Sequence, residues 1–186
     1  RQRDIVAIMD QGSRDLQRRI EELIRYGSMV REPVRPATAE QPLADVVDGV
    51  LARHRLALDA RRLTVDTQLD AAAVRADRAQ LETALDNRLS NAVRFSPEGG
   101  RILVKSAPQA GTVALWVCDM GPGIPVAERH RVFEPFFQGS HQPASAVEGS
   151  GLGLSIVREA QLAAGGSAEV VDCAPWSTCF CLTWPV

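Results

Sequence analysis

Residues 81–96 carry apolar side chains at every third or fourth position, which is the period of an α-helix with one buried face. Polar residues recur with the same period between them. A helix over this stretch would therefore place a core-forming face opposite a face of amides and one cation. The apolar face would carry Leu81, Leu85, Leu89 and Ala92, and the polar face Thr83, Asn87, Asn91 and Arg94.

Two other segments show helical periodicity. Residues 1–31 carry Ile, Leu and Met, from Ile5 to Met29, separated by charged residues, and this pattern predicts a long amphipathic helix. Because its apolar stripe needs a partner, we expect it to pack in a helical bundle against a hairpin mate and a second copy of the chain, or alternatively on its own domain. Residues 42–62 predict a second amphipathic helix.

Alternating apolar and polar residues predict several β-strands. Asp77 stands just before the helix of residues 81–96 and is a suitable N-cap for it. A turn around Pro108 and Gly111 would join two of the strands, and the last two would form a terminal hairpin. The predicted strands are residues 63–69, 74–76, 101–105, 112–118, 168–171 and 179–184.

Two prolines, Pro33 and Pro36, end the N-terminal helix, since neither proline nor the residue before it readily continues an α-helix. The chain then divides into a helix over residues 1–32, a linker over 33–41 and a domain over 42–186. The order of elements in that domain predicts an α+β sandwich, with a mixed sheet of about five strands and helices on one face.

The composition is that of a globular protein of 186 residues, with 45% hydrophobic and 24% charged residues. The formal net charge of -2 provides no basic field, so we expect no nucleic-acid partner, and a bound anion would need local donors. No apolar run approaches the roughly 20 residues of a membrane span. The chain begins at Arg1 without a signal peptide, which suggests a cytoplasmic piece of a longer protein with any membrane anchor outside it.

The four cysteines lack the paired C-x-x-C spacing of a zinc site. Two of them alternate with apolar residues in a predicted strand. We therefore expect all four to be reduced, buried and small hydrophobic residues of a cytosolic protein. They are Cys118, Cys173, Cys179 and Cys181.

The predicted strand 112–118 leads directly into Asp119, which is followed by Gly121, Pro122 and Gly123. A carboxylate at a strand end can accept a hydrogen bond from an exocyclic amine such as that of adenine, and the glycines let the backbone approach a flat ring. The same residues are also common in plain turns, so this motif alone leaves both interpretations open.

A glycine-rich segment, residues 148–153, passes into the apolar helix that follows it. Free backbone N–H groups at the start of a helix bind phosphate oxygens, and the helix dipole adds to the attraction. The segment is not a Walker loop, because it lacks G-x-x-x-x-G-K-[ST], and not a dinucleotide fingerprint, because no strand leads directly into it. It predicts a phosphate site of another kind.

Four segments, in this order, resemble the N, G1, F and G2 boxes of the ATP-binding domain of sensor histidine kinases, in the wider GHKL family that includes gyrase, Hsp90 and MutL. The resemblance covers about residues 40–186. It implies the Bergerat ATP-binding fold, a two-layer sandwich with three main helices on one face of the sheet. The boxes are Asn87–Ala92, Asp119–Gly123, Phe133–Phe137 and Gly149–Leu154.

The resemblance implies that the domain binds ATP together with Mg²⁺. Asn91 would supply an oxygen ligand to Mg²⁺, Asn87 and Arg94 would contact phosphates or their waters, and Asp119 would accept from the adenine amine. A lid from Phe137 to Glu148 would close over the triphosphate. The implied ATP-binding residues are Asn87, Asn91, Arg94, Phe95, Asp119, Gly121, Gly123, Ile124, Phe137, Gly149, Ser150, Gly151, Leu152, Gly153 and Leu154.

The resemblance also implies a protein histidine kinase that passes its phosphoryl group to the receiver domain of a response regulator. Residues 1–32 would be the second helix of the dimerisation hairpin, through which the full protein would form a homodimer. The acceptor pattern His-Glu-Leu-x-x-Pro-Leu belongs on the first helix and is missing from this sequence, and His54, His130 and His141 lie in other contexts. We therefore expect no phosphoacceptor histidine in the chain itself.

Three positions bear on activity. Hydrolysing members of the wider family have a Glu one helical turn before the magnesium-binding Asn; Asn87 stands there in this chain, so hydrolysis should be slow. Arg88 replaces a usual apolar residue and could reach the nucleotide or weaken packing, because a buried unpaired cation is costly. Met120 replaces a usual polar residue. Two alternative functions remain: a serine kinase acting on an anti-sigma-factor antagonist, and a degenerate module that acts through dimerisation alone.

Overall fold

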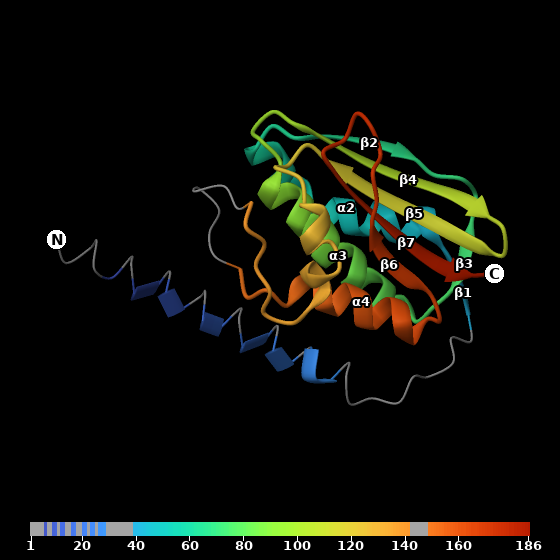
Figure 1. Cartoon of the computed structure of the whole chain (residues 1–186), viewed down its shortest axis with the longest axis horizontal. Helices are drawn as coiled ribbons and strands as arrows, with labels where there is room; N and C mark the ends of the chain where they lie inside the picture. The colour runs from blue at the N-terminus through green and yellow to red at the C-terminus, as the bar shows by residue number, and fades with distance from the viewer. Residues whose placement is uncertain are drawn as a thin grey trace.

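The computed structural model describes residues 39–141 and 149–186, together with separate positions in the first 28 residues. Every described position in that first segment is helical, in agreement with the predicted amphipathic helix, and these positions are drawn in blue near the label N in Figure 1. Most of the predicted linker and lid lies outside the described residues. The described positions of the first segment are 6, 9, 10, 12, 13, 16, 17, 20, 21, 23, 24 and 26–28.

A five-stranded sheet forms one layer of the domain, with the strand order β2-β4-β5-β7-β6 (Figure 1). β2 pairs with β4 in parallel, and the other neighbours are antiparallel, so the sheet is mixed as predicted. Its strands are β2 (Thr64–Gln68), β4 (Arg101–Gln109), β5 (Thr112–Asp119), β6 (Ser167–Val170) and β7 (Thr178–Pro185).

Three helices cover one face of this sheet and form the second layer (Figure 1). The main core lies between the two layers and contains apolar side chains of all three helices and of the sheet. The helices are α2 (Leu43–Ala60), α3 (Arg78–Phe95) and α4 (Gly153–Ala163).

Helix α3 forms where the hydrophobic period predicts it. The carboxylate of Asp77 caps its first turn by accepting the backbone N–H of Gln80 at 3.0 Å. The predicted apolar face is buried in the main core, which fixes the rotation of the helix about its axis and turns the amides away from the sheet. Its members Leu81, Leu85, Leu89 and Ala92 are at most 4% exposed.

Two details differ from the predicted strands. Glu40–Pro42 forms a short strand, β1, that pairs with β3 (Ala73–Arg75), whereas only a strand near β3 was expected. Strand β4 continues through Pro108 instead of turning there. Beyond Lys105 this strand has no β2 partner, and a strand edge tolerates proline because fewer ladder bonds need its N–H.

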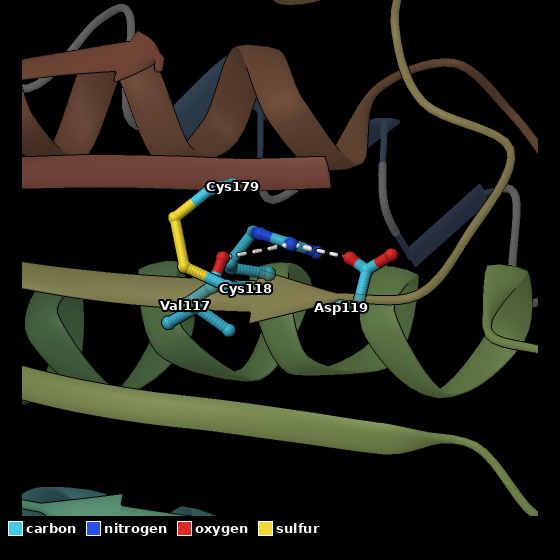
Figure 2. The surroundings of a disulfide bond; sticks show 5 residues. Val117, Cys118, Asp119 and Cys179 are labelled. Carbon is cyan, nitrogen blue, oxygen red and sulfur yellow. Dashed lines mark hydrogen bonds and ion pairs between the residues drawn. A yellow bond between two sulfur atoms is a disulfide. The ribbon is translucent and has the colours of Figure 1, made fainter. Parts of the chain in front are cut away.

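The other face of the sheet carries a smaller apolar cluster around a disulfide bond. Cys118 on β5 and Cys179 on β7 are register partners, and their sulfur atoms are bonded (Figure 2). The expectation that all four cysteines are reduced is therefore wrong for this pair. Antiparallel pairing brings the two side chains together although they are 61 residues apart in the sequence. Cys173 and Cys181 are free.

We expect two of the four cysteines to react with an alkylating reagent in denatured, unreduced protein, and all four after reduction. In the folded protein Cys173 should react before Cys181, because burial, with a smaller contribution from Glu169, raises the pKa of the Cys181 thiol to about 11 and leaves little thiolate at neutral pH. Mass spectrometry of the alkylated peptides measures how many cysteines react and in which order Cys173 and Cys181 do so.

Reduction should also lower the free energy of unfolding by about 2–4 kcal/mol, because the unfolded chain is then no longer constrained by the cross-link. Urea unfolding with and without reductant measures this change. Four alkylated cysteines in unreduced protein would contradict the disulfide.

Candidate functional site

A cavity of about 270 Å³ opens between α3, the loop after β5, the loop before α4 and strand β7. Charged, amide, glycine and aromatic residues all contribute to its walls. The lining residues are Asn87, Arg88, Ser90, Asn91, Arg94, Phe95, Asp119, Pro122, Gly123, Ile124, Pro125, Glu128, Val132, Phe137, Gln138, Gly139, His141, Gly149, Ser150, Gly151, Gly153, Leu154, Thr178 and Phe180.

The polar face of α3 forms one wall of this cavity. Asn87, Asn91 and Arg94 all line it, because residues three and four positions apart share a helix face. The amide nitrogen of Asn87 donates to the carbonyl oxygen of Thr83 at 2.8 Å. This bond leaves the amide oxygen near Gly153, where an added Cβ would lie 3.2 Å from it. Thr83 therefore anchors the wall without lining the cavity.

The C-terminal end of α3 is held by Arg61, the residue that follows α2. Its guanidinium donates to the carbonyl oxygens of Val93, Arg94 and Ser96. The last carbonyls of a helix lack partners within the helix, so a charged donor satisfies them. Arg94 and Phe95, which line the cavity, are thereby fixed at the end of the helix. No pattern in the sequence pointed to this role of Arg61.

Asp119 lies at the floor of the cavity, at the end of β5 (Figure 2). Its Oδ1 atom accepts the backbone N–H of Gly121 at 2.8 Å, and its Oδ2 atom accepts a guanidinium N–H of Arg88 at 2.6 Å. Each carboxylate oxygen has two lone pairs, so both can still accept a further hydrogen bond from a ligand.

Arg88 occupies the position at which we expected either contact with the nucleotide or weakened packing. It is only 1% exposed and belongs to the face of α3 that is buried against the sheet. Besides Asp119, its Nη2 atom donates to the carbonyl oxygen of Val117 at 3.0 Å, and its guanidinium carbon lies 4.2 Å from the centroid of the Phe180 ring. Arg88 is therefore a buried cation with a counter-ion, and the penalty of an unpaired charge does not arise.

Glycines shape the wall opposite α3. A Cβ on Gly149 would lie 2.3 Å from a guanidinium nitrogen of Arg94, so a larger residue there would displace this side chain. Gly151 has a φ of +74°, and a Cβ there would lie 2.7 Å from the backbone of Phe136. Helix α4 begins just after this loop at Gly153, and its N-terminal end therefore borders the cavity.

The rim of the cavity includes the short helix η1 (Val126–Glu128). Glu128 accepts the backbone N–H of Ser140 at 3.1 Å. Hydrogen bonds from Ser140, the side-chain one first and then the backbone one, lower the pKa of Glu128. The contact therefore involves the ionised carboxylate and is lost as pH falls through this lowered value. At neutral pH it ties the described beginning of the predicted lid to η1.

The structure brings together nearly all residues predicted for the site. Of these, Gly121 and Leu152 do not line the cavity: Gly121 supports Asp119 through its N–H group, and Leu152 is fully buried ahead of α4. Thr178 and Phe180 of β7 line the cavity although no motif pointed to them. Their contribution follows from the pairing of β7 with β5, which a single sequence does not reveal.

The three histidines belong to different elements or loops. His54 on α2 contacts the carboxylate of Asp86 on α3 at 3.0 Å. His130 is exposed between two short helical turns, and His141 lines the cavity at its rim.

In the described part of the chain, no helix has the length and apolarity that a bilayer crossing requires.

Comparison with known proteins identifies relatives of the chain. The family model for histidine kinase-, DNA gyrase B- and HSP90-like ATPases matches residues 76–186. The sensor histidine kinase GlrK of Escherichia coli (strain K12) is 39% identical over 185 residues, which are 99% of this chain and 38% of GlrK.

Two solved structures resemble the domain. The mycobacterial sensor histidine kinase MprB is 32% identical, with a TM-score of 0.71, over 79% of this chain and 97% of that one. Full-length ShkA in complex with AMPPNP shares the fold, with a TM-score of 0.82 at 24% identity, over 99% of this chain and 38% of that one.

The chain therefore belongs to the family of histidine kinase-, DNA gyrase B- and HSP90-like ATPases. Within it, the relatives are sensor histidine kinases, which confirms the resemblance seen in the four sequence boxes and the predicted α+β fold. The chain spans 38% of the length of GlrK.

Replacing Arg61 with Ala should release the end of α3 that carries Arg94 and Phe95. We expect the free energy of unfolding to fall by about 1.5–3 kcal/mol, because a charged donor to backbone carbonyls is lost. Arg62→Ala is the matched control: Arg62 is next in sequence, its side chain is 80% exposed, and its ion pair with Glu98 is on the surface. Urea unfolding of both variants measures the difference, and equal effects would contradict the role given to Arg61.

Proposed function

We propose that the domain binds Mg-ATP in this cavity and, in the whole protein, presents the γ-phosphoryl group to a histidine on a helix outside this chain. The proposal rests on the convergence of three chemically different groups on one cavity. They are the carboxylate of Asp119, the amide of Asn91 and the glycine loop that precedes α4. These groups suit a base, a hard metal ion and phosphate oxygens, respectively.

The base would lie at the Asp119 end. The walls there are apolar, with Ile124, Val132 and Phe180 among them, and the carboxylate is the acceptor at the floor. An apolar slot with one precisely held acceptor suits a flat ring that carries an exocyclic amine. Gly123, with a φ of +77°, lets the loop after β5 turn close to β7, where a Cβ would lie 3.2 Å from the carbonyl oxygen of Ser177. The residues present therefore fit adenine.

The phosphates would lie at the other end, between α3 and the start of α4. The first N–H groups of a helix have no partners within it, and together with the helix dipole they attract anions. Arg94 adds a full positive charge on the facing wall, directly beside Gly149. Arg94 and the N-terminal end of α4 would together compensate the negative charge of a polyphosphate.

Asn91 stands on the polar face of α3 between these two ends and offers an amide oxygen, a ligand that Mg²⁺ accepts. Bound Mg²⁺ would neutralise phosphate charge. One helical turn earlier, Asn87 provides an amide whose nitrogen is already bonded to Thr83, and an amide is not a general base for water. We therefore assign the site to phosphoryl transfer rather than to rapid hydrolysis.

The N-terminal segment supports assembly in the whole protein. Its described apolar side chains are exposed, among them Met9 at 68% and Leu16 at 60%. An apolar helical stripe of this kind is stabilised by packing against other helices. We propose that residues 1–32 belong to a dimerisation hairpin, that 33–41 form the linker and 42–186 the ATP-binding domain, and that a response regulator receiver domain takes the phosphoryl group.

The test is a calorimetric titration of the chain with AMPPNP and ADP, with and without Mg²⁺. We expect binding that Mg²⁺ strengthens by about tenfold, or ~1.4 kcal/mol. Asn91→Ala should abolish that increment, because it removes the oxygen ligand of the ion. Asn91→Asp is the matched control, since it keeps an oxygen at the same place and should retain the increment. A folded parent chain that binds neither nucleotide would overturn the proposal and favour a module that acts through dimerisation alone.

A further inference from the structure

Arg88 and Asp119 are the charged residues among the buried side chains of the described part of the chain. Their side chains are 1% and 2% exposed, respectively, and they are joined by the 2.6 Å contact between Nη2 and Oδ2. The Nε–H group of Arg88 is buried without a hydrogen-bond partner, and Asp119 is the anionic group that its guanidinium contacts. Both residues of the pair line the cavity.

We propose that Arg88 is a positioning and specificity-determining residue of the base site. It holds the Asp119 carboxylate in one orientation, so that the cavity takes a base with an exocyclic amine and rejects a base with a carbonyl in its place. This inference rests on the proposed function, because it deepens the role given there to Asp119.

The chemistry of the carboxylate explains the selectivity. An ionised carboxylate only accepts hydrogen bonds, whereas a protonated one also donates. The amine of adenine donates to the ionised form, and the carbonyl oxygen of hypoxanthine at the same place would face carboxylate lone pairs without a proton between them.

Arg88 fixes the carboxylate in space, because Oδ2 is held by Nη2 while Oδ1 is held by the N–H of Gly121. The contact of Nη2 with the Val117 carbonyl oxygen anchors the guanidinium itself to β5.

Other charged groups near the pair are common to all variants that we would compare. Arg94, Glu128 and His141 also line the cavity and have ionisable side chains. The register partners of Asp119 on the neighbouring strands, Ile102 and Thr178, carry no charge. Because these groups are unchanged in a variant at position 88, a difference from the parent chain reports the loss of Arg88.

The experiment measures the affinities of Mg-ATP and Mg-ITP by calorimetry at neutral pH. ITP carries a carbonyl in place of the amine and a proton on the adjacent ring nitrogen. In the parent chain we expect ATP to bind about 10- to 100-fold more tightly than ITP, the value of one hydrogen bond to a charged group. In Arg88→Leu we expect this ratio to fall toward one, because the carboxylate is no longer held where it accepts from the amine.

Two further variants control the comparison. Arg88→Lys keeps a cation beside the carboxylate and should restore the preference for ATP. Arg101→Leu removes a guanidinium from an exposed ion pair with Asp66, outside the cavity, and should behave as the parent chain. Thermal unfolding of each variant establishes that it is folded before binding is compared.

Folded Arg88→Leu protein with the selectivity of the parent chain would overturn the proposal. Parent protein that binds ATP and ITP equally would refute this inference while leaving nucleotide binding intact, whereas binding of neither would refute the proposed function itself.

Discussion

The buried ion pair between Arg88 and Asp119 is the contact on which the rest of the site depends. It joins α3 to the end of β5 beneath the cavity floor, at 2.6 Å and with almost no exposure to water. Neither charge is stable there alone, since removing one partner of a buried pair costs about 3–5 kcal/mol. The same ion pair therefore fixes both the position of α3 on the sheet and the orientation of the Asp119 carboxylate. A residue assigned to base recognition is at the same time part of the folded core.

The surrounding elements place opposite charges at the two ends of the cavity. The floor carries the acceptor oxygens of Asp119, and the opposite end carries Arg94 and the N-terminus of α4. A ligand with a hydrogen-bond donor at one end and negative charge at the other is therefore favoured in one orientation only. Arg61 supports this arrangement from α2, because it holds the turn of α3 on which Arg94 stands.

Much of this architecture could be predicted because it depends on local spacing. The period of residues 81–96 was sufficient to predict the buried face of α3 and the shared wall formed by Asn87 and Asn91. The pairing of Arg88 with Asp119 could not be predicted in this way, because the two residues are 31 positions apart and meet only through the packing of α3 on β5. The disulfide between β5 and β7 has the same origin: a shift of one residue in their register would turn one sulfur to the opposite face of the sheet.

The most direct test of this account is a double-mutant cycle on the pair, with Arg88→Leu, Asp119→Asn and the combined variant compared by urea unfolding. If the two charges stabilise each other in the folded core, each single variant loses about 3–5 kcal/mol, and the combined variant loses less than the sum by about 2 kcal/mol or more. Losses that simply add would contradict the account, because they would show that the helix, the strand and the base site do not depend on a shared ion pair.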